Sequence, residues 1–296
     1  MEAFESHCGG LVAPESDDNP WGYKFSWNPR NVILAGQGGA AKYTEDGVTR
    51  YIPYHRLFQR TVQVEVKGYG LFEGYANRDS LAYRSHYGID DIPTLKRGTL
   101  RKAGYCTAWD ALVQLGCTDD TYTMELGPKN TWREYIDAFL PHDAIRGTRL
   151  NLAYHLNLDP QGPVMGRLDW LGLFEDTPIG IEGRSPAAML QHLLEDKWKL
   201  GPEDKDLVVM WHRFRYSVEG VHQELHASLA VCGKDSVHTA MAATVGLPIA
   251  MATKLVLNGK IPERGVLLPL RPNIYDPVLD ELEKHGIVFN EVEVEM

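Results

Sequence analysis

The feature that most constrains the fold is a change of hydrophobic period that occurs twice along the chain. Residues 1–106 alternate locally with period two, as in Val62–Val66, which is typical of half-buried strands. Residues 107–202 carry apolar side chains three and four positions apart, which is typical of helices. Strand-like runs return in residues 203–296. This order predicts an α+β domain formed by both ends of the chain, with an all-helical insertion over 107–202.

The helical prediction depends on three groups of large apolar residues in the middle of the chain. They span Trp109 to Leu115, Trp132 to Phe139 and Met189 to Leu194, and each repeats at helical spacing. Thr131 and Glu134 have the spacing of a capping box, in which each residue satisfies a backbone amide of the other. We therefore expect several short helices, one of them beginning after Thr131.

Apolar runs in the last third of the chain predict strands and one short helix. The expected strands are Leu207–Met210, Leu225–Val231, Val266–Leu268 and Ile287–Phe289. A helix is expected from Pro277 to Lys284, because a basic residue and a glycine follow as stop signals.

A longer helix is expected over Val237–Leu257. Asp235 or Ser236 would be its N-cap, and Gly259 would close it. Because this segment is apolar nearly all round, we expect a core helix buried within the domain.

Charge and hydropathy exclude two classes of partner. The net charge of −10 disfavours nucleic acid, because an acidic surface repels phosphates. The longest apolar stretch, Met241–Leu257, contains Pro248 and Lys254, which predicts that it does not span a bilayer.

The cysteines predict a location rather than a site. The four residues, Cys8, Cys106, Cys117 and Cys232, form no CxxC pair and have no metal-type spacing. Reduced thiols in a cytoplasmic protein are the expected state. The polar N-terminus predicts no signal peptide.

Two motifs resemble known sites but lack the required context. Gly36–Ala41 fits the dinucleotide pattern G-x-G-x-x-A, yet Lys42–Gly47 reads as a turn where the pattern needs a helix. We expect a glycine-rich loop and no dinucleotide site there. His222 and His226 flank Glu224 in an order unlike a zinc helix, and on a strand they would lie about 13 Å apart, so no metal site is expected.

A cluster of arginines in loop-like settings is the strongest chemical signal. Arg78 lies among turn-forming residues, Arg97 and Arg101 flank Thr99, and Cys8 precedes two glycines. Arginine binds carboxylates through two parallel hydrogen bonds, so convergence of the three would suit a ligand with several carboxylates. The alternative is that each arginine is solvated or paired with an internal carboxylate.

At these residues the chain resembles the saccharopine dehydrogenase (glutamate-forming) family. The similarity extends over nearly the whole chain, and the helical part is only loosely similar. Arg97–Arg101 matches the family's R-G-T-L-R in full. The other segments that are similar to family motifs are Ser6–Glu15, Asn19–Trp27, Tyr75–Ser80, Asp206–Phe214, Thr239–Pro248 and Gly265–Phe289.

The resemblance implies an activity, a fold and a set of site residues. The family joins 2-aminoadipate semialdehyde to glutamate and reduces the imine with NAD(P)H, giving saccharopine; the reverse reaction belongs to lysine breakdown. It implies an α+β substrate-binding and dimerisation domain on a mixed sheet, and a homodimer. Trp27 corresponds to a position near the nicotinamide. The residues that fall where the family contacts saccharopine are Cys8, Arg78, Thr99, Leu100 and Arg101, and Arg97 joins them from its position in the cluster.

The chain departs from the family in three ways. His7 stands where the family has Tyr, Val12 stands where it has Pro, and the family's N-terminal Rossmann-type domain is not in this sequence. NAD(P) is therefore implied by resemblance alone. Hydride transfer would need a partner chain that carries a Rossmann domain. We expect either this partner or oligomer contacts to cover the apolar C-terminal face. The alternative function is a non-catalytic amino-acid-binding or interaction module that keeps the family fold.

Overall fold

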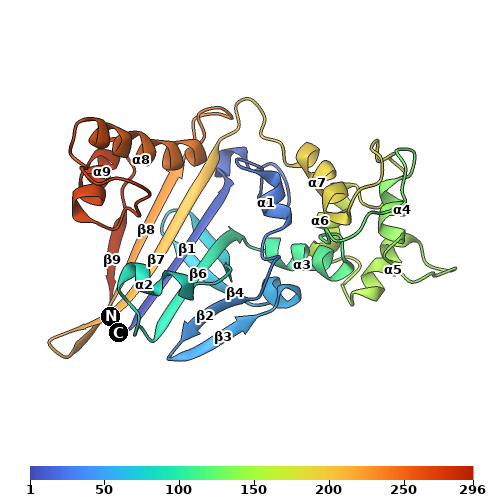
Figure 1. The fold of residues 1–296 in the computed structure, drawn as a ribbon. Coiled ribbons are helices and arrows are strands. Elements are labelled where there is room, and N and C mark those ends of the chain that lie inside the picture. Colours follow the sequence, from blue (N-terminus) through green and yellow to red (C-terminus); the bar gives the residue numbers. More distant parts are fainter. Residues whose placement is uncertain (296) are drawn as a thin grey trace.

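One mixed sheet organises the computed structural model, which describes residues 1–295 (Figure 1). Its nine strands in that range run in the order β3-β2-β6-β1-β7-β8-β9, with β5 also pairing with β6 and β4 with β5. β1 is parallel to β6, and every other pair is antiparallel. The α+β fold and the mixed sheet are thus confirmed. The strands are β1 (Ala3–Val12), β2 (Ala41–Glu45), β3 (Val48–Ile52), β4 (Thr61–Val66), β5 (Gly70–Ala76), β6 (Thr94–Lys102), β7 (Asp206–Val218), β8 (Val221–Cys232) and β9 (Asn290–Val294).

β1 lies between the strands from the first third of the chain and the strands from the last third. It pairs with β6 on one side and with β7 on the other, so Cys8 lies opposite both Thr99 and Met210. The period-two segment Val62–Val66 and the apolar runs Leu207–Met210 and Leu225–Val231 all fall within strands, as predicted.

Five helices between the two sets of strands form a block beside the sheet, at the right of Figure 1. The predicted capping box begins α4: Thr131 Oγ1 accepts from the Glu134 amide at 3.2 Å, and Glu134 Oε2 accepts from the Thr131 amide at 2.8 Å. The helices of the block are α3 (Tyr105–Leu115), α4 (Trp132–Asp137), α5 (Thr148–His155), α6 (Pro163–Leu171) and α7 (Pro186–Lys197).

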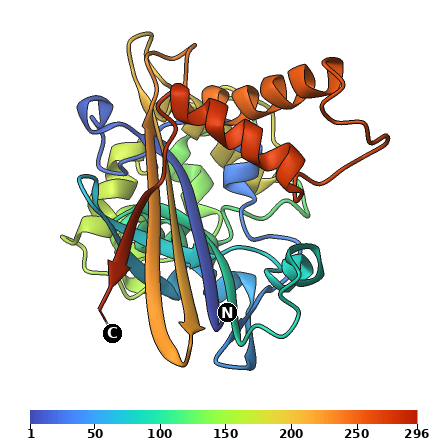
Figure 2. The same cartoon turned by 90° about the vertical axis from the view of Figure 1, so that its left-hand side faces the viewer.

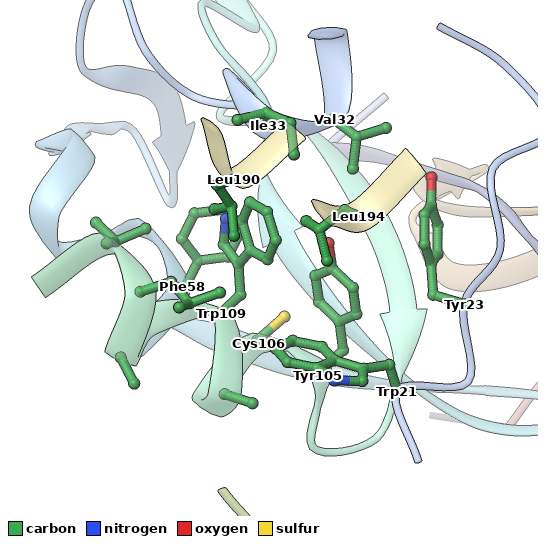
Figure 3. Close-up of a cluster of buried hydrophobic side chains, with 14 of the residues drawn as sticks. Trp21, Tyr23, Val32, Ile33, Phe58, Tyr105, Cys106, Trp109, Leu190 and Leu194 are labelled. Atoms are coloured by element: carbon green, nitrogen blue, oxygen red, sulfur yellow. The ribbon is translucent and has the colours of Figure 1, made fainter. Parts of the chain in front are cut away.

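Aromatic packing ties this block to the N-terminal segment. Trp21 contacts the ring of Tyr105 at a centroid distance of 5.6 Å (Figure 3). It also contacts the ring of Trp198 at 5.3 Å, and its indole N–H donates to the Arg167 carbonyl at 3.0 Å. One hydrophobic cluster runs from the sheet into the block. The boundaries of the predicted insertion at 107 and 202 remain a prediction.

The long apolar helix differs from its prediction in burial and in its N-cap. α8 (Ala240–Leu257) buries only Ala240 and Met251. The N-cap is Thr239 rather than Asp235 or Ser236, because Thr239 Oγ1 accepts from the Ala242 amide at 3.0 Å. Asp235 accepts from the amides of Val237 and His238 in a separate preceding turn. The predicted buried core helix is wrong: nothing within residues 1–295 covers most of the apolar circumference of α8.

The end of α8 agrees with the sequence. Gly259 adopts a left-handed φ of +69° just after the C-cap, and the amide of Lys260 donates to the Leu255 carbonyl, which is a Schellman ending. By length and composition alone α8 could cross a membrane, and a single such helix is weak evidence. It continues through Pro248.

The remaining C-terminal elements are shifted from their expected positions. α9 (Pro272–Lys284) ends as predicted but begins five residues early. Val266–Leu268 is an exposed loop rather than a strand, and the last strand is Asn290–Val294 rather than Ile287–Phe289. These apolar runs lack a neighbouring strand to pair with, so hydrophobicity alone was misleading. α8 and α9 pack together at one end of the sheet (Figure 2).

Two further short helices and the 3-10 turns complete the secondary structure of the described residues. α1 (Pro29–Ile33) includes Val32 of the apolar run before the glycine segment, and α2 (Arg84–Tyr87) follows a 3-10 turn at Leu81–Tyr83. Two more 3-10 turns occupy Pro14–Ser16 and Tyr54–Gln59.

Candidate active site: an arginine-lined cavity

Strand alternation places most of the predicted binding residues on one face of the sheet. Arg97, Thr99 and Arg101 are every second residue of β6, so their side chains share a face. Cys8 and Tyr75 pair with Thr99 from the two neighbouring strands and project to the same side. The common face follows from the backbone alone.

A cavity of about 420 Å³ lies on this face and contains no carboxylate in its lining. Arg78, Arg97 and Arg101 all contribute to its wall, within a chain of net charge −10. Such a cavity attracts anions against the repulsion of the rest of the molecule. The lining residues are Trp27, Asn31, Ala35, Gly36, Tyr75, Ala76, Asn77, Arg78, Tyr83, Arg97, Thr99 and Arg101.

The three guanidinium groups are not neutralised by any carboxylate of the described residues. Across residues 1–295, no Asp or Glu oxygen lies within 4.0 Å of Arg78, Arg97 or Arg101. A cation without an internal anion remains available to a bound carboxylate.

Arg101 is buried, with 2% of its surface exposed. Its guanidinium lies over the rings of Tyr23, Tyr105 and Tyr75, at 5.0, 5.3 and 5.9 Å from the ring centroids. Glu73 pairs with Arg101 across the strands, but its carboxylate accepts from the amides that begin α3 instead. Aromatic rings therefore surround this charge where a carboxylate would usually stand.

Arg97 is held in a similar way. Its guanidinium carbon lies 4.1 Å above the ring centre of Tyr83, and its amide donates to Ser80 Oγ at 2.9 Å. Cation–π contact fixes the plane of the group without cancelling its charge.

Arg78 lies at a bend that carries it to the rim. Its φ is +47°, a left-handed conformation that is uncommon for a residue with a side chain. The bend is held because the Arg78 carbonyl accepts from the Lys42 amide at 2.8 Å. The adjacent Asp79 carboxylate lies 3.7 Å from Lys42 Nζ and so faces away from the arginines.

Cys8 and Leu100 stand apart from the other predicted binding residues. The Cys8 thiol is exposed on the arginine face, but outside the cavity lining. Although the residue reaches solvent, the protein atoms packed around its sulfur desolvate the thiolate and raise the pKa of the thiol, while Arg101 and Arg97 oppose that rise. Leu100 points to the opposite face and is part of the hydrophobic core, so only its backbone can reach a ligand. Its carbonyl accepts from Arg101 Nη1 at 2.9 Å.

Trp27 stands between two hollows. It lines the arginine cavity and a second hollow of about 500 Å³ that reaches Thr239, the N-cap of α8. Its indole N–H donates to the Tyr23 hydroxyl at 3.1 Å. The side chain is 38% exposed, so one of its faces is open to a ligand.

The segment Gly36–Ala41 does not have the geometry of a dinucleotide site. A helix, α1, precedes it, and strand β2 follows it, whereas the fingerprint needs the reverse order. The helices that do follow strands are also closed to phosphate. Glu73 accepts from the first amides of α3, and Asp206 accepts from the first amides of α8. The described residues therefore do not fit the pyrophosphate of NAD(P).

His222 and His226 lie on β8, as predicted, and each has a carboxylate neighbour. His222 Nδ1 is 2.8 Å from Glu2, and His226 Nε2 is 2.7 Å from Glu224. No group of three potential metal ligands occurs among the residues that the structure describes.

Sequence reasoning missed part of the cavity wall. Tyr83 and Asn31 come from short helices, and Gly36 comes from the loop after α1. Tyr75 could have been predicted, because it lies near the end of β5 and two residues before Asn77, which also lines the cavity. Tyr83 had no comparable signal, since its position depends on a turn.

Comparison with known proteins identifies the family to which the chain belongs. The family model of the saccharopine dehydrogenase C-terminal domain matches residues 1–287. The chain is 34% identical to saccharopine dehydrogenase [NADP(+), L-glutamate-forming] of Saccharomyces cerevisiae, over 98% of this chain and 66% of the yeast protein. It is 36% identical to the mitochondrial alpha-aminoadipic semialdehyde synthase of Mus musculus, over 98% of this chain and 32% of the mouse protein.

A solved structure agrees with the sequence comparison. Apo histidine-tagged saccharopine dehydrogenase (L-Glu forming) from S. cerevisiae superposes with a TM-score of 0.87 at 34% identity, covering 100% of this chain and 67% of the yeast chain. The chain thus spans about two thirds of its yeast relatives. It belongs to the saccharopine dehydrogenase C-terminal domain family.

Proposed function

We propose that this chain binds saccharopine, as the substrate-binding part of a glutamate-forming saccharopine dehydrogenase. The observation that carries the proposal is the convergence of Arg78, Arg97 and Arg101 on one cavity without internal carboxylate partners. Saccharopine has three carboxylates, and each guanidinium can bind one through two parallel hydrogen bonds. Thr99 adds a hydroxyl on the same wall.

The direct test is calorimetric titration of the chain with saccharopine. Replacing Arg101 by Met should weaken binding by roughly 2–5 kcal/mol, because a desolvated charge-assisted contact is lost. Arg133→Met is the matched control, since Arg133 lies on α4 and pairs with Asp176 at 2.7 Å. Failure of the wild-type chain to bind saccharopine, or equal affinities for both variants, would refute the proposal.

We propose further that a nucleotide-binding domain packs against α8. The exposed fractions of Val245, Ile249 and Val256 are 55%, 63% and 43%, an unusual amount of apolar surface for one helix. A domain carrying the NADP site would cover this surface and bring the nicotinamide toward Trp27. The saccharopine dehydrogenase of S. cerevisiae is named for the cofactor NADP(+).

Reconstitution tests the role of such a domain. We expect a Rossmann-domain chain with NADPH, glutamate and 2-aminoadipate semialdehyde to give NADPH consumption only when this chain is added. Tight binding of saccharopine without turnover under these conditions would favour the non-catalytic binding module instead.

Two expectations from the sequence remain proposals. A homodimer is one, and light scattering of the purified chain measures it. Cytoplasmic location is the other, and the mouse relative is named as mitochondrial, so fractionation of the source cells is the appropriate experiment.

A further inference from the structure

The surroundings of Arg101 are unusual for a buried cation. A charge removed from water is normally compensated by an anion, since its desolvation is costly. Arg101 is 2% exposed, and its Nε has no hydrogen-bond partner among the described residues. Apart from the Leu100 carbonyl, which accepts from Nη1, its guanidinium is flanked by the rings of Tyr23, Tyr75 and Tyr105, which come from three separate segments of the chain. We call these three residues the tyrosine cage.

The cage carries no charge of its own. Burial raises the pKa of all three phenols, and the opposing effect of Arg101 does not reverse that rise. Neutral rings present their negative faces to a cation and attract it, most strongly where water is excluded. They hold the guanidinium in place and leave its positive charge for a ligand.

The chain keeps its own carboxylates away from this position. Glu73 faces Arg101 across the β5–β6 pair and is the natural internal partner. Its two oxygens instead accept from the amides of Gly104 at 2.7 Å and Cys106 at 3.0 Å, which begin α3. The same bonds place Tyr105, the first residue of α3, against the guanidinium. The Glu73 carboxylate therefore helps to position Tyr105 and does not pair with Arg101.

Packing behind the rings makes the cage rigid. Tyr105 stacks on Trp109 with centroids 5.7 Å apart (Figure 3). The ring of Tyr23 contacts that of Trp198 at a centroid distance of 5.1 Å. Tyr23 and Tyr105 are 0% and 2% exposed. The guanidinium therefore has little freedom to rearrange when a ligand enters or leaves.

We propose that Tyr23, Tyr75 and Tyr105 are positioning residues that act on ligand affinity through Arg101, keeping its charge unneutralised and aimed at a ligand carboxylate. This inference rests on the proposed function, because it assumes that Arg101 binds a carboxylate of the ligand. It adds that the affinity depends on the rings of Tyr23 and Tyr105, which are not part of the cavity lining, as well as on Tyr75, which is.

A double-mutant cycle with saccharopine as the probe tests the inference. Tyr105→Leu removes the ring and should raise the dissociation constant roughly 10-fold, whereas Tyr105→Phe keeps the ring and should change it by less than about 3-fold. In an Arg101→Met background, Tyr105→Leu should change it by less than about 2-fold, because the group through which the ring acts is gone. A merely structural role would give the same change in both backgrounds.

Tyr135→Leu is the matched control, because Tyr135 is also fully buried but lies on α4, where its ring neither contacts Arg101 nor lines the arginine cavity. It should cost similar stability and leave saccharopine affinity unchanged. If Tyr105→Leu weakens binding no more than Tyr135→Leu, or equally with and without Arg101, the cage inference is overturned while the proposed function stands. If the wild-type chain binds no saccharopine, the proposed function itself fails.

A measurement without ligand covers the case in which Tyr105→Leu does not fold. The Arg101 Nε–H resonance, assigned by its loss in Arg101→Lys, should be shifted by the surrounding rings and exchange slowly with solvent. Tyr105→Phe should preserve that shift. An unshifted, fast-exchanging Nε–H in the wild-type chain would overturn the cage.

Discussion

The arginine cavity and the α8–α9 layer differ in how completely this chain builds them. The cavity is framed by strands, turns and rings that all come from residues 27–101 and are fixed by internal hydrogen bonds and packing. The α8–α9 layer has a small core of its own around Met251, Val278 and Leu282, and its outer surface is apolar and exposed.

The difference indicates which part of the proposed function lies in this chain. A charged cavity with immobile walls is ready for a ligand before the ligand arrives. An exposed apolar helix is instead typical of a surface that another domain covers. We therefore expect ligand recognition to be intrinsic to the chain and catalysis to depend on what packs against α8. The predictions below probe these two regions and the connection between them.

The largest expected effect is at Asp206, which anchors α8 to the sheet. Its carboxylate is 0% exposed and accepts from the amides of Ala240 at 2.6 Å and Met241 at 2.9 Å. Asp206→Ala leaves both amides without this acceptor and should lower the free energy of unfolding by about 3–5 kcal/mol. Urea unfolding and hydrogen exchange along α8 measure it.

Asp235→Ala is the control for that experiment, because Asp235 accepts two amides in the exposed turn before α8. It should cost about 1 kcal/mol. Equal losses for the two variants would mean that α8 is not held to the sheet at this point, which would break the comparison between the regions.

The next effect concerns His7, on the sheet face opposite the arginines. It is fully buried, and neither ring nitrogen has a partner among the described residues. Burial chiefly, with smaller contributions from Lys96 and His212, lowers its pKa to about 3. Below about pH 6.5 the imidazole takes up a proton in the unfolded chain but stays neutral in the folded chain. The free energy of unfolding therefore falls as the pH drops from about 6.5 toward 3.

The expected loss from His7 between pH 7 and pH 5 is roughly 2 kcal/mol. His7→Phe removes the titrating group and should reduce the loss of unfolding free energy over this range by that amount. The phenyl ring must fit the space of the imidazole, which stacks on Trp211. On its other side the imidazole lies so close to Gly98 that a Cβ atom built on that glycine would be 2.4 Å from His7 Cδ2. An unchanged slope in the variant would show that His7 is protonated in the folded state.

A smaller effect is expected from the link between Trp27 and the tyrosine cage. Tyr23→Phe keeps the ring over Arg101 but removes the acceptor of the Trp27 indole N–H. Because Trp27 is partly exposed and water can replace the hydroxyl, stability should fall by about 0.5–1.5 kcal/mol. The Trp27 emission, isolated by difference from Trp27→Phe, should shift to the red. No shift would mean that this bond does not orient the indole.

The sequence predicted the cavity better than the C-terminal layer, for a physical reason. Arg97, Thr99 and Arg101 had to share a face once β6 was recognised, since side chains alternate along any strand. The same rule puts the Leu100 side chain on the other face, whereas the family resemblance predicted Leu100 as a binding residue without saying which of its atoms would reach the ligand. The rings of Tyr83 and Tyr105 reach the arginines through a turn and a helix start, and their positions depend on tertiary packing.

The mistaken burial of α8 has a different origin. An all-round apolar pattern states that a helix avoids water, but not which chain covers it. The expected strand at Val266–Leu268 failed similarly, because an apolar run becomes a strand only beside a partner strand. Both errors lie in the region where residues 1–295 leave apolar side chains exposed.

The smallest expected effect is on the exposed face of α8, and it separates the two regions most directly. Ile249→Glu should change the free energy of unfolding by no more than about 0.5 kcal/mol, because the side chain is 63% exposed and glutamate suits a helix. Met251→Glu, two residues away and 9% exposed, is the contrasting variant and should be strongly destabilising. Ile249→Glu should also reduce binding of an apolar dye and abolish capture of a nucleotide-binding domain, while saccharopine affinity stays unchanged. If Ile249→Glu instead destabilises the chain as Met251→Glu does, α8 is already covered in solution, and the surface assigned to a partner belongs to the chain's own assembly.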